Sequence, residues 1–269
     1  MSELTKRVLF ALVAAPIFIG LIVVGGIYLW ILLVLISILT AKEIADLFTA
    51  VGYKTRLIPV ILLSVAAMGI TFNGASLIGF TFLIFLVIIK ETLNATHDRY
   101  LSILTTIYAA VYPAWGFYSF YELRNWESDT TGLTLVLMVL VMIWGNDSFA
   151  YFVGRKFGKH KMAPEISPAK SWEGFFGGFL GAAIILALFV AFSNLTINVF
   201  VIAPLVIIVS VFGPIGDLSE SKIKRFAGKK DSSNLLPGHG GFFDRFDSVI
   251  LVFPAVLFYF QIIKALGLI

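Results

Sequence analysis

Residues 132–153 read GLTLVLMVLVMIWGNDSFAYFV, an apolar run interrupted by the polar triplet Asn146-Asp147-Ser148. A helix needs about 20 apolar residues to cross the hydrocarbon core of a bilayer, so this stretch predicts a membrane span. A carboxylate inside a span is costly to bury, which makes Asn146 and Asp147 candidate functional residues that could contact a substrate. A structural hydrogen bond between helices is the alternative explanation for the same triplet.

Similar apolar runs recur along the chain and predict an all-α, polytopic integral membrane protein. Hydrophobic residues make up 59% of the 269 residues and charged residues 13%, against about 45–50% and about 25% in soluble domains. Cysteine is absent, which excludes disulfides and thiolate metal sites. The runs predict about nine transmembrane helices, at residues 8–25, 27–45, 57–73, 76–90, 101–121, 132–153, 173–192, 197–215 and 248–268. Only Gly25-Gly26 separates the first two runs and the fourth is short, so eight or ten spans remain open.

The distribution of basic residues predicts the orientation of the chain. If the N-terminus lies in the cytoplasm and nine spans alternate, every Lys and Arg except Arg124 and Lys264 lies on the cytoplasmic side, and the C-terminus lies outside. This asymmetry agrees with the positive-inside rule and predicts a multi-pass protein of the inner (cytoplasmic) membrane. We divide the chain into residues 1–130, with about five spans, and residues 131–269, with polar cytoplasmic loops at 154–172 and 216–247.

The second loop carries several acids beside a predicted span. Asp244 and Asp247 are three residues apart and would share a face of a helix, while Asp217 lies at the other end of the loop and Asp231 lies between. Mg²⁺ prefers carboxylate oxygens and is usually bound by one or two of them together with substrate phosphates. Surface pairing with neighbouring Lys and Arg residues is the alternative, and such pairs contribute little to stability.

Glycines separate the basic part of this loop from its acidic end. Gly238, Gly240 and Gly241 surround His239, and glycine allows positive φ and close backbone approach. Successive backbone N–H groups in such a segment can bind an anion, although a tight turn would need glycine equally. His239 could donate to a phosphate, or it could hydrogen-bond within the turn.

Basic residues in the same loop suggest contact with phosphates. They are Lys222, Lys224, Arg225, Lys229 and Lys230, with Ser221 directly before them. They could bind the phosphates of a substrate, or form an amphipathic helix that is attracted to anionic lipid headgroups. The two functions are compatible with each other.

The first loop ends in a second group of polar residues. Lys170 and Ser171 could donate hydrogen bonds to a phosphate, and Glu173 is a further possible metal ligand. Serine is also a preferred N-cap residue, so Ser171 could instead cap the helix that follows. The sequence leaves both roles open.

The motifs of both loops resemble those of the phosphatidate cytidylyltransferases, also called CDP-diacylglycerol synthases. In the second loop the resemblance rests on residues 221–225, 230–231 and 236–247, the last of which read LPGHGGFFDRFD. In the first it rests on residues 147–151, Gly154-Arg155, residues 157–159 and residues 167–174, the last of which read SPAKSWEG. A chance match over so many positions is improbable, and the resemblance covers the C-terminal half of the chain.

This resemblance implies a reaction and a set of site residues. CTP and phosphatidate would give CDP-diacylglycerol and pyrophosphate in a helical membrane enzyme that requires Mg²⁺, with two cations and room for a monovalent one. A homodimer in contact with membrane lipid is expected, and nucleic acid is not an expected partner. The implied metal ligands are Asp217, Asp244 and Asp247, with Asp147, Glu173 and Asp231 as further candidates. The expected catalytic residues are Asp217, Asp244, Asp247, Lys224, Arg225 and His239. The expected substrate-binding residues are Asn146, Asp147, Lys170, Ser171, Ser221, Gly238, Gly240, Gly241 and Arg245.

Two other classes of protein remain open on the sequence. A CTP-dependent kinase of a polyprenol or similar lipid alcohol would use the same nucleotide but release CDP. A transporter would explain polar residues within a span, such as Asn146 and Asp147. The gathering of charge at one predicted face of the membrane argues against a route through the bilayer.

Overall fold

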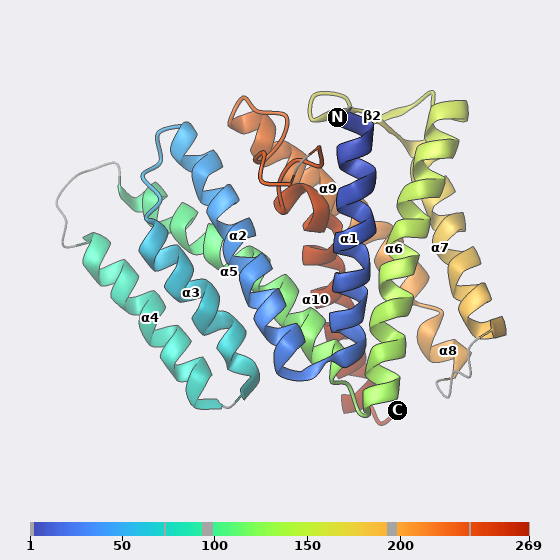
Figure 1. Ribbon diagram of the computed structural model, residues 1–269, viewed down its shortest axis with the longest axis horizontal. Helices are drawn as coiled ribbons and strands as arrows, with labels where there is room; N and C mark the ends of the chain where they lie inside the picture. Colours follow the sequence, from blue (N-terminus) through green and yellow to red (C-terminus); the bar gives the residue numbers. More distant parts are fainter. Residues whose placement is uncertain (1–2, 73, 93–98, 193–197, 237, 269) are drawn as a thin grey trace. The chain divides into compact units, whose positions relative to one another are not determined.

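The computed structural model describes residues 3–72, 74–92, 99–192, 198–236 and 238–268 (Figure 1). Their helices are α1 (Glu3–Val24), α2 (Gly26–Ala50), α3 (Leu57–Gly69), the 3₁₀ turn η1 (Ile70–Phe72), α4 (Gly74–Thr92), α5 (Arg99–Arg124), α6 (Asp129–Phe157), α7 (Trp172–Phe192), α8 (Val199–Ile202), α9 (Leu205–Phe226) and α10 (Phe243–Ala265). Strands β1 (Lys161–Ala163) and β2 (Ser167–Ser171) form one antiparallel hairpin. The all-α prediction is therefore confirmed apart from this small hairpin.

Several of these helices are long and apolar enough to cross a membrane. Within the described residues, five segments meet both conditions: α2, α6, α7, α10 and the stretch Val199–Phe226, which contains α8 and α9. Shorter apolar helices cover Leu12–Val24, Leu57–Gly69 and Leu77–Ile89. The chain is thus a multi-pass membrane protein, whereas the count of nine spans and the orientation of the termini stay predictions. Pro237 and the side chains of Lys6, Arg7, Lys90 and Arg99, which enter the sequence argument, lie outside the described part of the chain.

The polar segments expected as loops are more ordered than the sequence suggested. Helix α9 continues to Phe226 and α10 begins at Phe243, so residues 227–242 alone connect them. Lys224 and Arg225 lie in the last turn of α9, where cations interact favourably with the helix dipole. Gly228 follows with φ +65°, a conformation that commonly ends helices. The first loop is likewise shortened by α6, which runs to Phe157, and by the hairpin.

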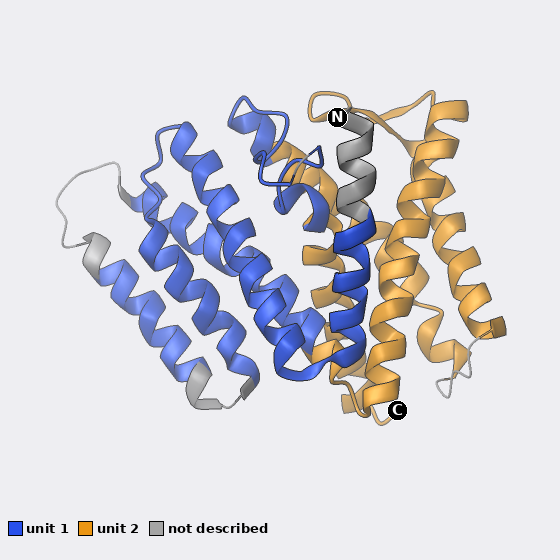
Figure 2. Cartoon of the chain, viewed as in Figure 1, with its two compact units in different colours: residues 1–121, 223–246 blue, residues 122–222, 247–269 orange. Residues whose placement is uncertain are grey.

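The described chain divides into two compact units that interleave along the sequence (Figure 2). Unit 1 contains residues 1–121 and 223–246, and unit 2 contains residues 122–222 and 247–269. Helices α9 and α10 contribute to both units. Each unit therefore combines two segments that are separate in the sequence.

Unit 1 is joined by contacts among α2, α3 and α5. The Trp30 indole donates to the carbonyl of Met68 across 3.1 Å, and the Ser64 hydroxyl donates to the carbonyl of Ala110 across 3.3 Å. These long-range bonds link α2 to α3 and α3 to α5. Because polar side chains inside a membrane protein lack water, such bonds to backbone carbonyls satisfy them.

Unit 2 is built on a close approach of α6 and α7. Glycines recur on one side of α7 at 174, 177, 178 and 181, and all four are buried. A Cβ atom added at Gly178 would lie 2.6 Å from Asn146 Oδ1, and one at Gly181 would lie 2.6 Å from the carbonyl oxygen of Gly145. Small residues at helix interfaces permit this approach in membranes. The contact buries Asn146, which is 1% exposed, and thereby sets the position of the neighbouring Asp147 on α6.

Gly178→Ala is expected to lower the melting temperature of the detergent-solubilised protein. The added methyl group meets the Asn146 side chain, and overpacking of this kind costs about 1–3 kcal/mol. Gly79→Ala is the matched control, because Gly79 lies within α4 and an added Cβ has no neighbour within 4 Å. Alanine favours a helix over glycine by up to about 1 kcal/mol, so this control should be neutral or stabilising. Equal melting temperatures for the two variants would contradict the proposed packing.

Candidate active site

Three carboxylates meet in unit 2. Asp217 and Glu220 lie on α9 and Asp247 lies on α10, and one oxygen of each is within 4.8 Å of the others. Asp217 and Glu220 are three residues apart on one helix and therefore share a face. We call these three residues the acidic cluster. Carboxylate oxygens at this spacing form a donor set that suits a hard divalent cation.

Glycines on α9 allow α10 to approach closely enough to complete the cluster. A Cβ atom at Gly216 would lie 3.0 Å from the Cα of Ser248, so a larger residue would push α10 away. The Ser248 hydroxyl donates to the carbonyl of Gly213 across 3.2 Å, which fixes the two helices at this level. The backbone N–H of Ser248 also donates to Asp247 Oδ1 across 2.7 Å and orients that carboxylate.

The β hairpin brings a base to the acidic cluster. Lys170 lies on β2, and its Nζ is 2.7 Å from Asp217 Oδ2 and 3.2 Å from the carbonyl oxygen of Pro214. The Lys170 side chain is 21% exposed and that of Asp217 is 40% exposed. An ion pair with this exposure is accessible to solvent.

Helix α6 adds a fourth acid to the surroundings of the cluster. The Asp147 carboxylate is close enough to Asp217 and Asp247 for like-charge repulsion. The Lys170 ammonium group attracts Asp147, Asp217 and Asp247. The Asn146 amide donates to Asp147 Oδ1 across 3.4 Å. Among the described residues, the buried Oδ1 of Asn146 has no hydrogen-bond partner. The structure thus brings together Asn146, Asp147, Lys170, Asp217 and Asp247 from the set predicted on the sequence.

Asp244 has a separate set of contacts within unit 1. Its Oδ1 is 2.7 Å from Lys224 Nζ, and its side chain is 6% exposed. Its Oδ2 accepts hydrogen bonds from the backbone N–H and the hydroxyl of Ser232, at 2.9 and 2.7 Å, and from the N–H of Gly241 at 2.8 Å. Asp244 therefore holds the loop between α9 and α10. The metal-binding role expected for it stays a prediction beside this observed structural one.

The glycine-rich segment forms a tight turn. Gly238 and Gly240 have φ of +74° and +79°, which L-amino acids rarely adopt. The N–H of Leu236 donates to the carbonyl of Gly240 and the N–H of His239 donates to the carbonyl of Leu236, both at 2.9 Å. Arg245 Nε donates to the carbonyl of His239 at 2.9 Å. These glycines therefore allow the backbone to form a tight turn, as one of the two explanations from the sequence requires. Phosphate binding by the same segment stays a prediction.

Two polar residues of the first loop have structural contacts. Ser171 is buried and its hydroxyl accepts from the N–H of Gly174 across 3.2 Å, so the capping role is observed. Glu173 accepts from the backbone N–H groups of Lys159 and His160, at 3.1 and 3.2 Å, and lies 2.6 Å from His160 Nδ1. Glu173 thus connects α7 to the segment that enters the hairpin.

The remaining predicted residues are placed as follows. The Ser221 hydroxyl donates to Asp217 Oδ1 across 3.3 Å, at the edge of the acidic cluster. Arg225 donates to the carbonyl of Lys229 across 2.8 Å and closes the end of α9. Asp231 is exposed. These positions leave their predicted roles in binding metal or substrate untested.

Sequence reasoning missed two acids. Glu220 lies within the same motif as Asp217, and continuing the helix through residue 220 would have placed both on one face. Glu43 lies on α2 between Lys42 and Asp46 and is 1% exposed. Its signal was its position inside the predicted span 27–45, where a carboxylate is rare unless it has a partner.

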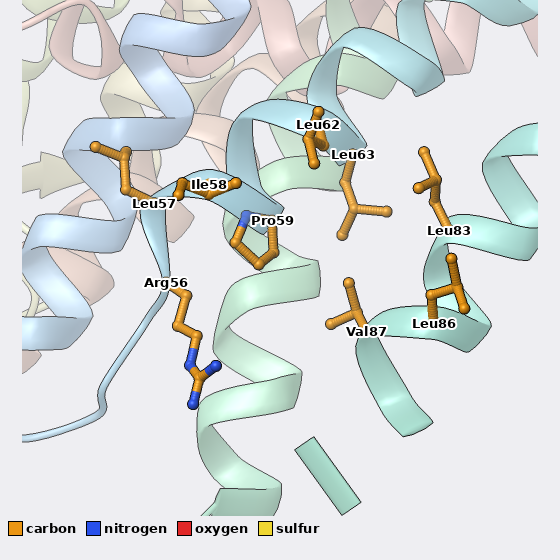
Figure 3. A pocket seen from close by; sticks show the side chains of 9 residues that line it. All are labelled: Arg56, Leu57, Ile58, Pro59, Leu62, Leu63, Leu83, Leu86 and Val87. Atoms are coloured by element: carbon orange, nitrogen blue, oxygen red, sulfur yellow. The ribbon is translucent and has the colours of Figure 1, made fainter. Parts of the chain in front are cut away.

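Unit 1 also contains an apolar pocket of about 600 Å³ between α3 and α4 (Figure 3). Its lining residues are Arg56, Leu57, Ile58, Pro59, Leu62, Leu63, Leu83, Leu86 and Val87. This lining offers no carboxylate for a cation. Its composition suits hydrocarbon chains and distinguishes it from the acidic cluster of unit 2.

Apolar helices of membrane-spanning length carry an acidic cluster with a lysine beside it, which defines the chain as a helical membrane protein with a charged site. Comparison with known proteins makes the class specific: the sequence model described as the cytidylyltransferase family matches residues 5–263. The chain therefore belongs to the cytidylyltransferase family, and the resemblance found in its motifs is confirmed.

Named relatives narrow the class further. The chain is 35% identical over 270 residues to the phosphatidate cytidylyltransferase of Bacillus subtilis, covering 96% of this chain and 98% of the relative. It is 34% identical over 253 residues to the phosphatidate cytidylyltransferase of Staphylococcus epidermidis, covering 92% of this chain and 95% of that relative. Both matches extend over the N-terminal half, which the motifs alone did not cover.

Proposed function

We propose that this protein transfers a cytidylyl group from CTP to phosphatidate and releases pyrophosphate. The observation that carries the proposal is the acidic cluster with Lys170, found in a member of the cytidylyltransferase family. The names of its relatives supply the lipid substrate. The product would be CDP-diacylglycerol.

The reaction needs positioning and charge neutralisation more than base catalysis. A phosphate oxygen of phosphatidate attacks the α-phosphorus of CTP, and the bond from that phosphorus to the bridging oxygen of the pyrophosphate breaks. The attacking phosphate monoester is already an anion near neutral pH, so no strong base is required. Two polyanions must nevertheless be brought together, and charge develops on the leaving group. Oriented binding and electrostatic stabilisation are the usual means of catalysis for such transfers.

The acidic cluster would hold a divalent cation. Asp217, Glu220 and Asp247 offer carboxylate oxygens within 4.8 Å of one another, which is the donor chemistry that Mg²⁺ prefers. When bound, Mg²⁺ would neutralise charge on the phosphate oxygens and on the leaving pyrophosphate. We include a second cation in the proposal, and Asp147, which is close to Asp217, would be one of its ligands. Lys170 would bind a phosphate oxygen in exchange for its present contact with Asp217.

The reaction would take place at the cytoplasmic face of the cell membrane. The positive-inside distribution supports a cytoplasmic N-terminus and cytoplasmic polar segments, and CTP is a cytoplasmic nucleotide. Phosphatidate would enter sideways from the inner leaflet. We extend the proposal to a homodimer, as the family resemblance implies.

Product analysis tests the proposed function directly. The purified protein is incubated with phosphatidate, labelled CTP and Mg²⁺, and we expect labelled CDP-diacylglycerol with an equal amount of pyrophosphate. Omission of phosphatidate and chelation of the metal are the controls. Release of CDP with a polyprenol acceptor would instead identify a lipid-alcohol kinase. Solute flux in proteoliposomes without CTP turnover would identify a transporter.

A further inference from the structure

Helix α2 carries a buried carboxylate that has no role in the acidic cluster. Glu43 is 1% exposed and lies in a helix that is long and apolar enough to cross a membrane. A charge in that setting is costly unless other groups stabilise it. The hydrogen bonds of Glu43 therefore identify the part of the protein that stabilises its charge.

Four hydrogen bonds connect Glu43 to the loop between α9 and α10. Its Oε1 accepts from the Ser233 hydroxyl at 2.6 Å and from the N–H of Phe242 at 3.0 Å. Its Oε2 accepts from the Ser232 hydroxyl at 2.9 Å and from the N–H of Phe243 at 2.8 Å. Each oxygen thus receives one backbone amide, and Oε1 also receives the Ser233 hydroxyl. The single proton of the Ser232 hydroxyl is shared between Oε2 and Asp244 Oδ2. Phe243 begins α10, where a negative charge is stabilised by the helix dipole.

The same loop is held from its other side by Asp244. The Ser232 hydroxyl lies within hydrogen-bond distance of both carboxylates, at 2.9 Å from Glu43 and 2.7 Å from Asp244. Gly241 lies between them, and an added Cβ would be 2.5 Å from Glu43 Oε1. Any side chain at position 241 would displace the Glu43 carboxylate. Residues 232–233 and 241–243 are therefore held between two carboxylates, one from α2 and one from α10.

We propose that Glu43 is a positioning residue for the glycine-rich loop. By fixing residues 232–243, it would hold the turn at Gly238–Gly241 in one conformation, ready to bind the phosphates of CTP. Without this anchor the segment would sample many conformations, and the nucleotide would have to order it upon binding. Glu43 itself touches no substrate in this proposal and acts through the loop. The inference rests on the proposed function, which supplies CTP as the nucleotide.

Glu43→Gln is the sharpest test, because it keeps the size of the side chain and removes its charge. Whichever way the amide turns, its NH₂ group faces the backbone N–H of Phe242 or Phe243, and two donors cannot bond to each other. Asp46→Asn is the matched control: Asp46 lies on the same helix, its side chain is 55% exposed, and it pairs with Lys42 at 2.7 Å. Both changes replace a carboxylate by an amide on α2.

We expect two results for Glu43→Gln and neither for Asp46→Asn. Hydrogen exchange at the amides of residues 232–236 and 238–243 should become about tenfold faster, since a hydrogen bond to a charged group is lost and local opening becomes easier. The KM for CTP should rise by about tenfold while the KM for phosphatidate stays unchanged. Exchange at helix α6 should not change.

Other outcomes would overturn the proposal. A lower melting temperature with both KM values unchanged would show that Glu43 only stabilises the fold, and unchanged exchange in the loop would show that it does not clamp it. If Glu43→Gln does not fold, Ser233→Ala is the milder variant: it removes the hydroxyl that donates to Glu43 and accepts from the N–H of Leu235. It should change exchange and the KM for CTP in the same directions. If the wild-type protein forms no CDP-diacylglycerol, the proposed function fails, whereas the exchange measurement still decides whether Glu43 clamps the loop.

Discussion

Asp217→Asn is expected to reduce the rate of cytidylyl transfer about a thousandfold. Removal of a single group that stabilises charge in a transition state typically lowers the rate by a factor of this size. The substitution removes one of three carboxylate charges that would bind the divalent cation. It also breaks the ion pair with Lys170, but that pair is partly exposed and such pairs contribute about 0–1 kcal/mol to stability. The variant should therefore remain folded and lose activity.

The measurement is the rate of CDP-diacylglycerol formation at increasing Mg²⁺ concentration, together with the melting temperature in detergent. A higher Mg²⁺ requirement in Asp217→Asn and in Asp247→Asn would support a shared cation site. Glu165→Gln is the control, because Glu165 is an exposed acid of unit 2 in the turn between β1 and β2. Wild-type activity and Mg²⁺ dependence in Asp217→Asn would remove the acidic cluster from the proposed mechanism.

Asp244→Asn is expected to cause the largest loss of stability. The substitution keeps an oxygen for the bonds from Ser232 and Gly241 but takes the negative charge from a position 2.7 Å from the Lys224 ammonium group. Both side chains are largely buried, at 6% and 11% exposed. Removing one partner of a buried ion pair typically costs about 3–5 kcal/mol because the remaining charge is poorly compensated.

Thermal unfolding of the single variants and of the double variant Asp244→Asn/Lys224→Gln checks this expectation. The double variant should recover part of the lost stability, since it contains neither charge of the pair. The sequence-based assignment of Asp244 as a metal ligand makes a different prediction. An Asp244→Asn protein with wild-type stability and a strongly reduced turnover that needs a higher Mg²⁺ concentration would support that assignment and contradict the dominant structural role.

The membrane spans could be predicted from the sequence because their length is a property of the bilayer. The run at residues 132–153 identified α6, although the helix extends from Asp129 to Phe157. Its ends were missed because a helix that leaves the hydrocarbon core can continue through polar residues. The same reason explains why α9 runs on to Phe226. In both cases the apolar length marked the span without marking the end of the helix.

The chemistry of the candidate site could be predicted in part. Asp217, Asp244 and Asp247 were expected to bind metal, and Asp217 and Asp247 lie in one cluster. Glu220 was missed because the polar end of α9 was taken for a loop, where residues three apart need not share a face. The hairpin that brings Lys170 to Asp217 was not predicted, because its strands are too short to show the alternation of polar and apolar residues that marks a strand.

By itself, the sequence determined that this chain is a multi-pass helical membrane protein and a member of the cytidylyltransferase family, because apolar length and motif residues are local properties. Only the tertiary structure decided which acids share a site. The α9–α10 contact at Gly216 brings Asp247 to Asp217 and Glu220, whereas Glu43 bonds to Ser232 and Ser233, far away along the chain. Such pairings depend on how closely helix backbones approach and on which buried charges find hydrogen-bond donors, and neither property belongs to any single segment.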